Sequence, residues 1–420
     1  MPVKADQPDL VQQFALSLTQ TDISENKKIG IAVSGGGDSI AMMHLAAAVL
    51  PRERLHVVSV NHGLRPEAAD ELALVKEQTE ALGISHQTLY WKWTGEGNLQ
   101  AAARDGRWNA IRDWAVQHSI RSVLIGHTVD DQAETVLLRL ARGSGVDGLA
   151  AMTAQDQRDG IQVLRPLLNM SRAELRLWLT ENQIAWSDDP SNDDRKYDRV
   201  KIRKMFDQLA EVGLSHKRLL QTADHMKAAH RSLQRAAHQF AAQHVVQEGG
   251  DLILSPDALE LDSEDTPRRV MAAALAWVAS QPYKPRFENL CARVAQARAG
   301  QKVTLAGCVL IPTSDGGLRI VREPSATKPV TINGQPNVKW DHRWKICGPM
   351  VPGTQVRALG DQLSDCEGWR ALGIPRDSLL GSPSIWQNDR LIAAPIAGVA
   401  EGWTAQIVAD FHSRAFGIED

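Results

Sequence analysis

Four short apolar runs alternate with segments of helical periodicity in the first half of the chain. The runs cover residues 29–33, 55–60, 86–91 and 122–126, and a segment of helical periodicity follows each one. Strands that alternate with helices in this way form a parallel, doubly wound α/β sheet. Ligands of such sheets bind beyond the carboxyl ends of the strands. The pattern therefore predicts a binding crevice where these four runs end.

The second half of the chain has a different pattern. Ser171 and Glu174 form a capping box that predicts a helix to about residue 182, and the polar residues 188–194 then interrupt the pattern. Helices are predicted over 214–247 and 267–299, and short strands over 303–310 and 318–322, with alternating apolar residues from 329 onward. We expect three domains: an α/β domain over 1–212, a mainly helical domain over 213–325 and a small α+β domain over 326–420.

A glycine-rich turn follows the first apolar run. It consists of Ser34, Gly35, Gly36, Gly37, Asp38 and Ser39, immediately before an apolar helical segment. Glycines permit positive φ and leave no side chain between the backbone amides and a ligand, and the start of a helix favours an anion. The turn predicts a phosphate-binding loop. A simple glycine turn capped by a serine would have the same local sequence.

Two common nucleotide-binding motifs do not explain this turn. The chain has no Gly-x-x-x-x-Gly-Lys-Ser/Thr, which argues against the loop of kinases and GTPases. The segment 143–148 has the glycine spacing of a dinucleotide motif, but it follows the helical run 134–142 and not a strand. Gly143 is explained more simply as the residue that ends that helix.

Carboxylates are concentrated after the fourth apolar run. Asp130, Asp131 and Glu134 stand three and four residues apart at the start of a predicted helix, so they share one face of it. Acidic residues in a first turn are also ordinary caps and dipole partners. Because these lie at the same sheet edge as the glycine turn, a second interpretation is a site for Mg²⁺ or for a cationic substrate.

Composition limits the class of protein. The chain has 420 residues, 43% of them hydrophobic, no apolar run long enough to cross a bilayer and no signal-peptide pattern in residues 1–10. We therefore expect a cytoplasmic globular protein without a membrane partner. The four cysteines at 291, 308, 347 and 366 are too few and too scattered for a disulfide framework or a zinc site, and buried thiols are expected.

One segment is strongly basic although the net charge of the chain is −3. Residues 195–235 contain eleven Lys or Arg against four Asp or Glu, a net charge of +7. A nucleic acid would have to bind such a local patch, because the molecule as a whole is not basic. A solvated helix face would have the same composition.

Together these motifs resemble the tRNA(Ile)-lysidine synthetases, a family of the PP-loop ATP pyrophosphatase superfamily. The matching segments are 34–39, 61–65, 98–108, 126–135, 142–143 and 189–192. The resemblance covers most of 27–205 and continues more weakly at 305–308, 320–323 and 383–395. The glycine turn alone is shared with thiouridine, GMP and argininosuccinate synthetases. Val200 departs from the family, which usually has asparagine there, and this leaves the role of that turn in tRNA contact open.

The resemblance implies a fold like that of the adenine nucleotide α-hydrolases and a specific reaction. ATP adenylates the oxygen on carbon 2 of the cytidine at the first anticodon position of an isoleucine tRNA with the CAU anticodon, and pyrophosphate leaves. The ε-amine of free L-lysine then attacks that carbon and displaces AMP, which gives lysidine. In this interpretation the first domain is catalytic and the helical domain binds tRNA.

The resemblance also assigns roles to residues of this chain. ATP would be bound by Ser34, Gly35, Gly36, Gly37, Asp38, Ser39, His62 and Gly126, with Asp38 also positioning Mg²⁺. Lysine would be bound by Asp131, Glu134 and Arg107, with Asp38, Asp131 and Arg107 as the catalytic residues. The tRNA would be bound by Arg195, Arg199, Arg203, Lys217 and Arg218. The carboxylate that deprotonates lysine stays open, and His62 and His127 could instead be structural caps.

Three alternatives make different demands on the sequence. A tRNA thiolase generally needs thiol or iron–sulfur chemistry near the ATP site, but no cysteine precedes Cys291. A glutamine-dependent amidotransferase would need a glutaminase with a nucleophilic cysteine, for which there is no signature. A non-catalytic, nucleotide-regulated RNA-binding protein would keep the loop and the basic segment but would not need the Asp131 and Glu134 pair. A homodimer is a further expectation that no sequence feature tests.

Overall fold

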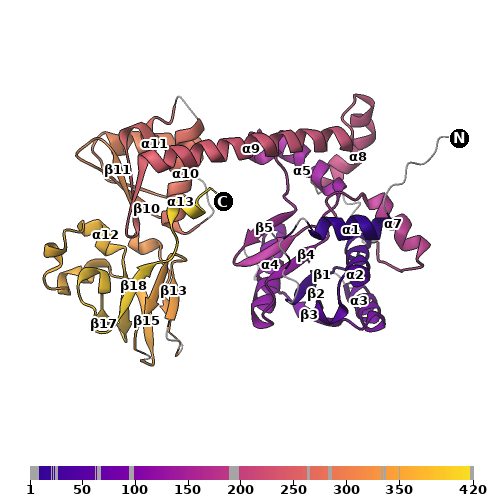
Figure 1. Ribbon diagram of the computed structural model, residues 1–420, viewed down its shortest axis with the longest axis horizontal. Helices are drawn as coiled ribbons and strands as arrows, with labels where there is room; N and C mark the ends of the chain where they lie inside the picture. Colours follow the sequence, from indigo (N-terminus) through magenta and orange to yellow (C-terminus); the bar gives the residue numbers. More distant parts are fainter. Residues whose placement is uncertain are drawn as a thin grey trace. The chain divides into compact units, whose positions relative to one another are not determined.

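The described part of the chain forms two units. The computed structural model describes residues 9–19, 21, 23, 27–61, 63, 68–93, 99–188, 198–262, 265–281, 286–332, 334, 337–349 and 351–416. The units are Met1–His230 and Arg231–Asp420, and the boundary between them lies within helix α9 (His216–His244) (Figure 1). The expected division into three domains at 212 and 325 stays a prediction.

A six-stranded sheet forms the centre of the first unit. Its strands are β1 (Ile29–Ala32), β2 (Leu55–Asn61), β3 (Ser85–Tyr90), β4 (Ser122–Ile125), β5 (Gln155–Arg158) and β6 (Ile161–Leu164). The order is β3-β2-β1-β4-β6-β5, and all neighbours are parallel except the hairpin of β5 and β6. The four strands predicted from the apolar runs are confirmed. The hairpin was not predicted.

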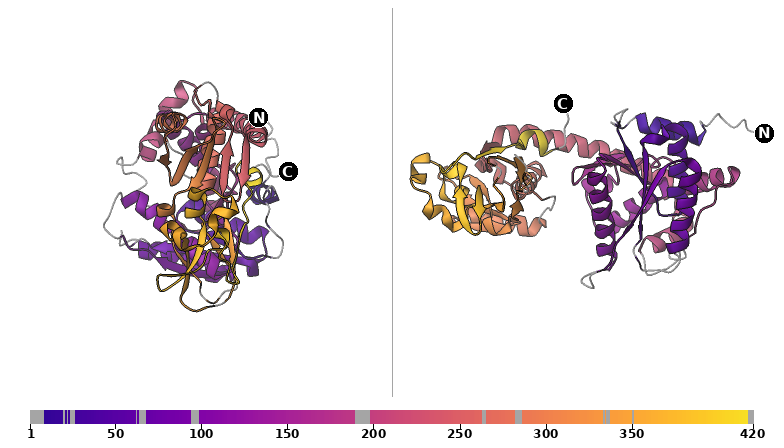
Figure 2. Two further views of the ribbon diagram at one scale, coloured as in Figure 1. Left: turned by 90° about the vertical axis from the view of Figure 1, so that its left-hand side faces the viewer. Right: turned by 90° about the horizontal axis from the view of Figure 1, so that it is seen from below.

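Helices cover both faces of this sheet (Figure 2). The helices of the unit are α1 (Leu10–Thr19), α2 (Gly37–Val49), α3 (Ala68–Leu82), α4 (Leu99–Gln117), α5 (Val129–Ala141), α6 (Val146–Leu149), α7 (Arg172–Glu181) and α8 (Asp198–Glu211), followed by the start of α9, and residues of α8 and α9 pack against α5. Ile31 and Leu124 pack in one core with α1, α2 and α7. Val58 and Val123 pack on the opposite face against Trp108 of α4. The doubly wound α/β fold is therefore confirmed.

The local helix signals also agree with the structure. Ser171 caps α7 and forms the predicted capping box with Glu174. Gly143 follows the end of α5 with a φ of +69°, the left-handed conformation in which glycine commonly ends a helix. The segment 143–148 therefore does not follow a strand and is not a dinucleotide loop. The long helix predicted to residue 247 ends at His244, where a strand begins.

The second unit combines helices with antiparallel sheets. A five-stranded sheet has the order β7-β8-β11-β10-β9, with strands at Val245–Glu248, Asp251–Leu254, Leu318–Arg322, Cys308–Pro312 and Val303–Leu305, and α10 (Asp265–Ala279) and α11 (Phe287–Arg298) pack on it. A four-stranded sheet follows with β12 (Val330–Thr331), β15 (Thr354–Ala358), β16 (Pro383–Gln387) and β17 (Arg390–Ala393). The remaining elements are β13 (Asn337–Trp340), β14 (Trp344–Cys347), β18 (Thr404–Ile407), α12 (Arg376–Leu380) and α13 (Phe411–Arg414).

A buried ionic contact joins the sheets of the second unit. Asp341, in the turn between β13 and β14, accepts two hydrogen bonds from Arg322 of β11 at 3.0 and 3.1 Å and one from Arg343 at 3.2 Å. Arg343 also donates to the backbone oxygen of Gly250. No helix in the described part of the chain is both long and apolar enough to cross a membrane.

Candidate active site

The glycine turn connects β1 to α2 and is fixed by its own hydrogen bonds. Gly35 has a φ of +93°, a conformation that side chains disfavour. The Oγ of Ser39 accepts from the Ser34 amide at 3.1 Å and donates to the Gly36 oxygen at 2.9 Å. The amide of Ser187 donates to the Gly35 oxygen at 3.0 Å. These hydrogen bonds fix the shape of the loop.

The end of β4 lies directly against the start of α2. A Cβ atom added to Gly126 would lie 3.4 Å from the backbone oxygen of Asp38. On the other side, a Cβ added to Gly37 would lie 3.3 Å from the ring of Trp186. Both glycines therefore stand where the backbone approaches its neighbours closely, and Gly126 lies beside the loop as predicted.

The carboxylates at the start of α5 point to different partners. Asp131 accepts from the amide of Thr128 at 2.9 Å and from its hydroxyl at 3.0 Å, so it completes a capping box. Asp130 accepts from the backbone amide of Arg172 at 2.9 Å. Glu134 has no exposed surface, and Asp131 is 6% exposed. Asp131 therefore acts as a helix cap, and it also forms a buried pair of carboxylates with Glu134.

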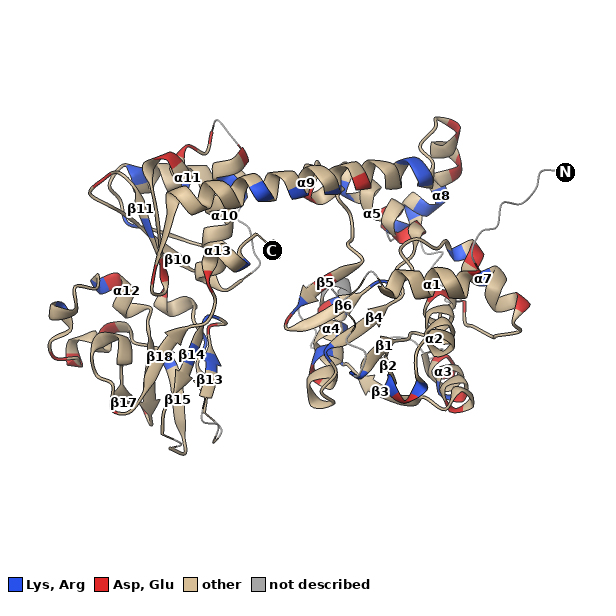
Figure 3. Cartoon of the chain, viewed as in Figure 1, with Lys and Arg blue, Asp and Glu red and all other residues tan. Residues whose placement is uncertain are grey.

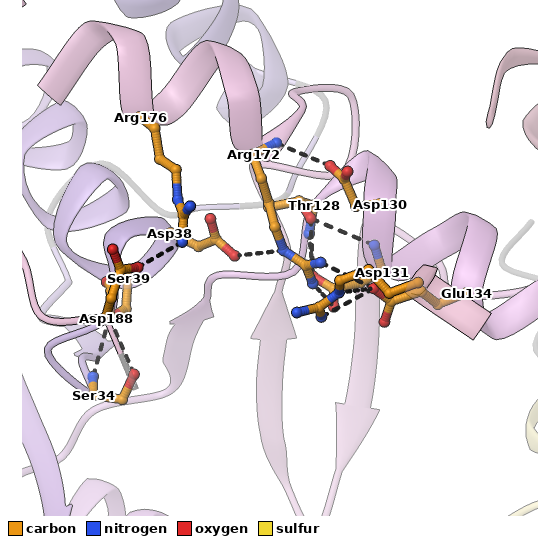
Figure 4. Close-up of polar contacts among 12 residues, drawn as sticks. Ser34, Asp38, Ser39, Thr128, Asp130, Asp131, Glu134, Arg172, Arg176 and Asp188 are labelled. Atoms are coloured by element: carbon orange, nitrogen blue, oxygen red, sulfur yellow. Dashed lines mark hydrogen bonds and ion pairs between the residues drawn. The ribbon is translucent and has the colours of Figure 1, made fainter. Parts of the chain in front are cut away.

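One guanidinium connects these carboxylates to the loop. Arg172 of α7 donates through Nε to Asp38 at 3.1 Å, through Nη2 to Asp131 at 2.6 Å and through Nη1 to Glu134 at 2.9 Å (Figure 4). Asp38 of the glycine turn and the Asp131 and Glu134 pair therefore contact the same guanidinium. Arg172 is not among the predicted site residues, and in the sequence it is only an interior position of the capping box of Ser171 and Glu174.

A second arginine approaches Glu134 from α8. The Nε of Arg203 donates to Oε1 of Glu134 at 3.0 Å, the oxygen that also accepts from Arg172. The other oxygen, Oε2, is buried and has no hydrogen-bond partner among the described residues. A pocket of about 370 Å³ lies beside this group, and its lining includes Asp130, Glu134, Arg172, Arg203, Phe206 and His216. The pocket has acidic, basic and aromatic walls.

Burial and the arginines shift the acidities of the crevice. Burial raises the pKa of Asp38, against the opposing charge of Arg172. Burial would also raise the pKa of Asp131, but Arg172 and the hydrogen bonds from Thr128 outweigh it, so the pKa of Asp131 is lowered. Burial alone would lower the pKa of Arg172, yet the three carboxylates raise it above its ordinary value. Arg172 is therefore a permanent cation.

His127 lies at the end of β4, next to Gly126. Burial lowers its pKa to about 4, and the positive charges of Arg165, Arg199 and Arg107 act in the same direction while Asp131 opposes them. Its Nδ1 is buried and has no hydrogen-bond partner among the described residues. The imidazole is therefore neutral at pH 7, and Arg107 and Arg199 lie within electrostatic reach of it.

The other predicted residues occupy several positions. Arg107 lies on α4 and is exposed, and the positive charges of Arg104 and Arg199 lie within electrostatic reach of it. Arg218 donates to the backbone oxygen of Gly213 at 3.0 Å, so it caps the end of α8. Lys217 is exposed. His62 and Arg195 lie outside the described residues. In Figure 3 the blue stretches of ribbon mark the Lys and Arg positions along α8 and α9.

The described residues do not form a magnesium site from protein ligands alone. Among the described residues no group of three or more His, Cys, Asp or Glu side chains is arranged to bind a metal ion. Mg²⁺ commonly binds to one or two carboxylates together with the phosphates of a nucleotide. Asp38 in the glycine turn fits that arrangement.

The fold and the crevice define the class of protein. A parallel sheet whose first strand enters a glycine loop at the start of a helix is a nucleotide-binding α/β domain, and the family model described as a PP-loop domain matches residues 8–209. A tRNA(Ile)-lysidine synthase from Ruegeria pomeroyi is 40% identical over 394 residues, which cover 92% of this chain and 93% of the relative. The chain therefore belongs to the tRNA(Ile)-lysidine synthase family, and its PP-loop domain implies the use of ATP.

Further relatives agree with this assignment. The tRNA(Ile)-lysidine synthase of Wolbachia pipientis wMel is 34% identical and covers 76% of each chain. That of Rhodopseudomonas palustris is 36% identical and covers 68% of this chain and 88% of the relative. The solved structure of a U34-tRNA thiolase NcsA from Methanococcus maripaludis has a TM-score of 0.45 at 18% identity, over 51% of this chain and 77% of the other. That last likeness is too distant to bear on function.

Proposed function

We propose that this chain is an ATP-dependent ligase that joins L-lysine to carbon 2 of the cytidine at the first anticodon position of isoleucine tRNA with the CAU anticodon. The observation that supports the proposal is that Arg172 contacts both Asp38 of the glycine turn and the Asp131 and Glu134 pair. A triphosphate site and a site for a cation are needed side by side for this reaction.

Adenylation would take place at the glycine turn. The amides of Ser34–Ser39 and the start of α2 would bind the phosphates of ATP, with Gly126 and His62 beside them. The cytidine oxygen attacks the α-phosphorus, and pyrophosphate leaves. Bound at Asp38 and the phosphates, Mg²⁺ would supply positive charge near the leaving pyrophosphate.

Lysine would bind on the other side of Arg172. An ammonium group has three donors, and Asp131 together with the unpartnered Oε2 of Glu134 supplies acceptors for them. Phe206 lines the adjacent pocket and offers an apolar surface to the aliphatic chain. Arg107 would bind the lysine carboxylate or the adenylated base. The amine must lose a proton before it attacks carbon 2.

The tRNA would bind through the basic side chains of α8 and α9. We assign phosphate contacts to Arg195, Arg199, Arg203, Lys217 and Arg218. Methionine tRNA has the same CAU anticodon, so discrimination requires contacts elsewhere on the tRNA, and the second unit is large enough to provide them. The proposal also includes a cytoplasmic location and a homodimer. Analytical ultracentrifugation of the full chain would test the homodimer.

The alternative of tRNA thiolation receives no support from the site. All four cysteines lie in the second unit, at 291, 308, 347 and 366, and Cys308 is buried with a pKa raised to about 12. Residues 1–290, which include the whole crevice, contain no cysteine. The crevice could not supply a thiolate by itself.

The test is a complete reaction with purified components. The chain is incubated with ATP, lysine and isoleucine tRNA bearing the CAU anticodon, and AMP, pyrophosphate and the mass of the cytidine are measured. We expect stoichiometric AMP and pyrophosphate and a mass gain of one lysine less one water. Asp131→Asn should abolish the gain while tRNA binding is retained, and Glu80→Gln on the exposed face of α3 serves as the control. Absence of AMP and of the mass gain with the unmodified chain would refute the proposal.

A further inference from the structure

We infer that Arg172 couples the two substrate sites: it occupies the lysine carboxylates while the nucleotide is absent and releases them when the triphosphate binds. This inference rests on the proposed function. It makes Arg172 a positioning residue that sets both the affinity for lysine and the order in which the substrates bind.

The guanidinium of Arg172 bridges three carboxylates on two helices. Its three guanidinium nitrogens each donate to a different carboxylate, Asp38 on α2 and Asp131 and Glu134 on α5. Its backbone amide is bound separately, to Asp130. The main chain at the start of α7 is therefore anchored, and the guanidinium can move without disturbing the helix.

The contacts of Arg172 are those that a substrate ammonium needs. Oδ1 of Asp131 and Oε1 of Glu134 already accept from the guanidinium at 2.6 and 2.9 Å. Three carboxylates face two guanidiniums here, those of Arg172 and Arg203, so one negative charge remains uncompensated. Oε2 of Glu134 is open to lysine, but lysine must compete with Arg172 for Oδ1 of Asp131 and Oε1 of Glu134. In the nucleotide-free chain its affinity should be low.

A bound triphosphate changes this competition. Asp38 lies in the first turn of α2, directly after the glycines, and its carboxylate is 3.1 Å from Nε of Arg172. Phosphates bound at the glycine turn would therefore lie near the guanidinium. Guanidinium groups form short, paired hydrogen bonds with phosphate oxygens, and these bonds are strong. If Arg172 turns toward the phosphates, Asp131 and Glu134 become available to the ammonium. ATP should then increase the affinity for lysine, and lysine should increase the affinity for ATP by the same factor.

The experiment measures lysine binding to the full chain by calorimetry, with and without the non-hydrolysable analogue α,β-methylene-ATP and Mg²⁺. In the unmodified chain we expect the analogue to increase lysine affinity by a factor of about 5 to 150, the usual range for coupled sites. In Arg172→Met, lysine should bind more tightly than in the unmodified chain when no nucleotide is present. The factor by which the analogue increases lysine affinity should fall to about 1. A merely structural role would weaken lysine binding instead.

Two further variants make the outcome decisive. Arg172→Lys keeps the positive charge but replaces three separate guanidinium donors with a single ammonium group. The factor by which the analogue increases lysine affinity should therefore be smaller than in the unmodified chain. This variant also serves as the measurement if Arg172→Met does not fold, as judged by its thermal midpoint. Arg112→Met removes an arginine on α4 that pairs with the exposed Asp113, and it should leave the factor unchanged.

Two results would overturn the inference. An unmodified chain whose lysine affinity is the same with and without the analogue, or Arg172 variants that bind lysine more weakly at an unchanged factor, would mean that Arg172 does not couple the sites. These measurements require binding only. A chain that shows the coupling but forms no lysidine would refute the proposed function, and a chain that forms lysidine without the coupling would refute this inference alone.

Discussion

The Nη1 of Arg172 lies 2.9 Å from Oε1 of Glu134, although the two residues are 38 positions apart. Glu134 is fully buried, and only 1% of its side chain is exposed. Removing one partner of a buried ion pair strongly destabilises the fold, because the charge that remains is buried without an opposite charge beside it. The pair is thus part of the stability of the first unit as well as of its chemistry.

Replacing Glu134 with glutamine tests this double role. The variant keeps the shape but removes the charge, so we expect the free energy of unfolding to fall by about 3 kcal/mol and lysidine formation to be abolished. Binding of α,β-methylene-ATP should be retained, since the glycine turn is not altered. Urea unfolding and the analogue titration measure the two effects. An unchanged unfolding free energy would contradict the buried ion pair.

The conformation of Gly35 predicts a separable effect on nucleotide binding. Alanine at φ +93° should cost about 1–3 kcal/mol of stability, and it should weaken binding of the ATP analogue because the loop must shift. Gly160 in the β5–β6 turn has a similar φ of +82°, and a Cβ added there would meet no atom within 4 Å. Gly160→Ala should therefore lose stability but bind the analogue normally. Equal binding by both variants would contradict a role of the loop in nucleotide binding.

His127 predicts a dependence of stability on pH. The folded chain keeps its imidazole neutral down to about pH 4, whereas the unfolded chain protonates it near 6.5. Between these values the unfolded state binds more protons, so stability falls as the pH falls, by up to about 3 kcal/mol for this group. The decrease should be smaller in His127→Gln. Urea unfolding of both proteins at pH 7, 5.5 and 4.5 measures it, and parallel curves would show that His127 does not contribute.

The basic helices predict a salt-dependent affinity for tRNA. Arg199→Ala and Lys217→Ala each remove one side chain that we assign to a phosphate, so each should flatten the plot of log affinity against log salt by about 0.7 to 0.9. Lys76 on α3 pairs with Glu80 and is largely exposed, so Lys76→Ala is a suitable control. Filter binding at several salt concentrations gives the slopes. If Arg199→Ala and Lys217→Ala have the slope of the unmodified chain, the assignment of phosphate contacts to α8 and α9 is wrong.

The parts of the fold that could be predicted from sequence are those with local causes. Buried strands such as β1 and β4 appear as apolar runs, and their ends are marked by glycines at 35–37 and 126. The capping box at Ser171 and the glycine that ends α5 depend only on neighbouring residues. Because parallel strands end at one edge of a sheet, even the proximity of Asp131 to the glycine turn could be inferred.

The parts that could not be predicted depend on tertiary contacts. Gln162 interrupts the apolar residues of β6, and its neighbour β5 is polar throughout, so neither has a clear pattern. The end of α9 at His244 coincides with no helix-breaking residue in the sequence. The role of Arg172 depends on residues 38, 131 and 134, and no spacing in the sequence shows that one side chain reaches all three.

The position of Arg172 directly after the cap Ser171 has an evolutionary consequence. The residue at which α7 starts also sets the direction of the Arg172 side chain. If the helix started one residue earlier or later, this side chain would turn by about 100° around the helix axis and leave the crevice. Selection on catalysis would then constrain a serine and a glutamate that touch neither substrate. Substitutions at Ser171 and Glu174 should therefore be tolerated far less than their places near the surface suggest.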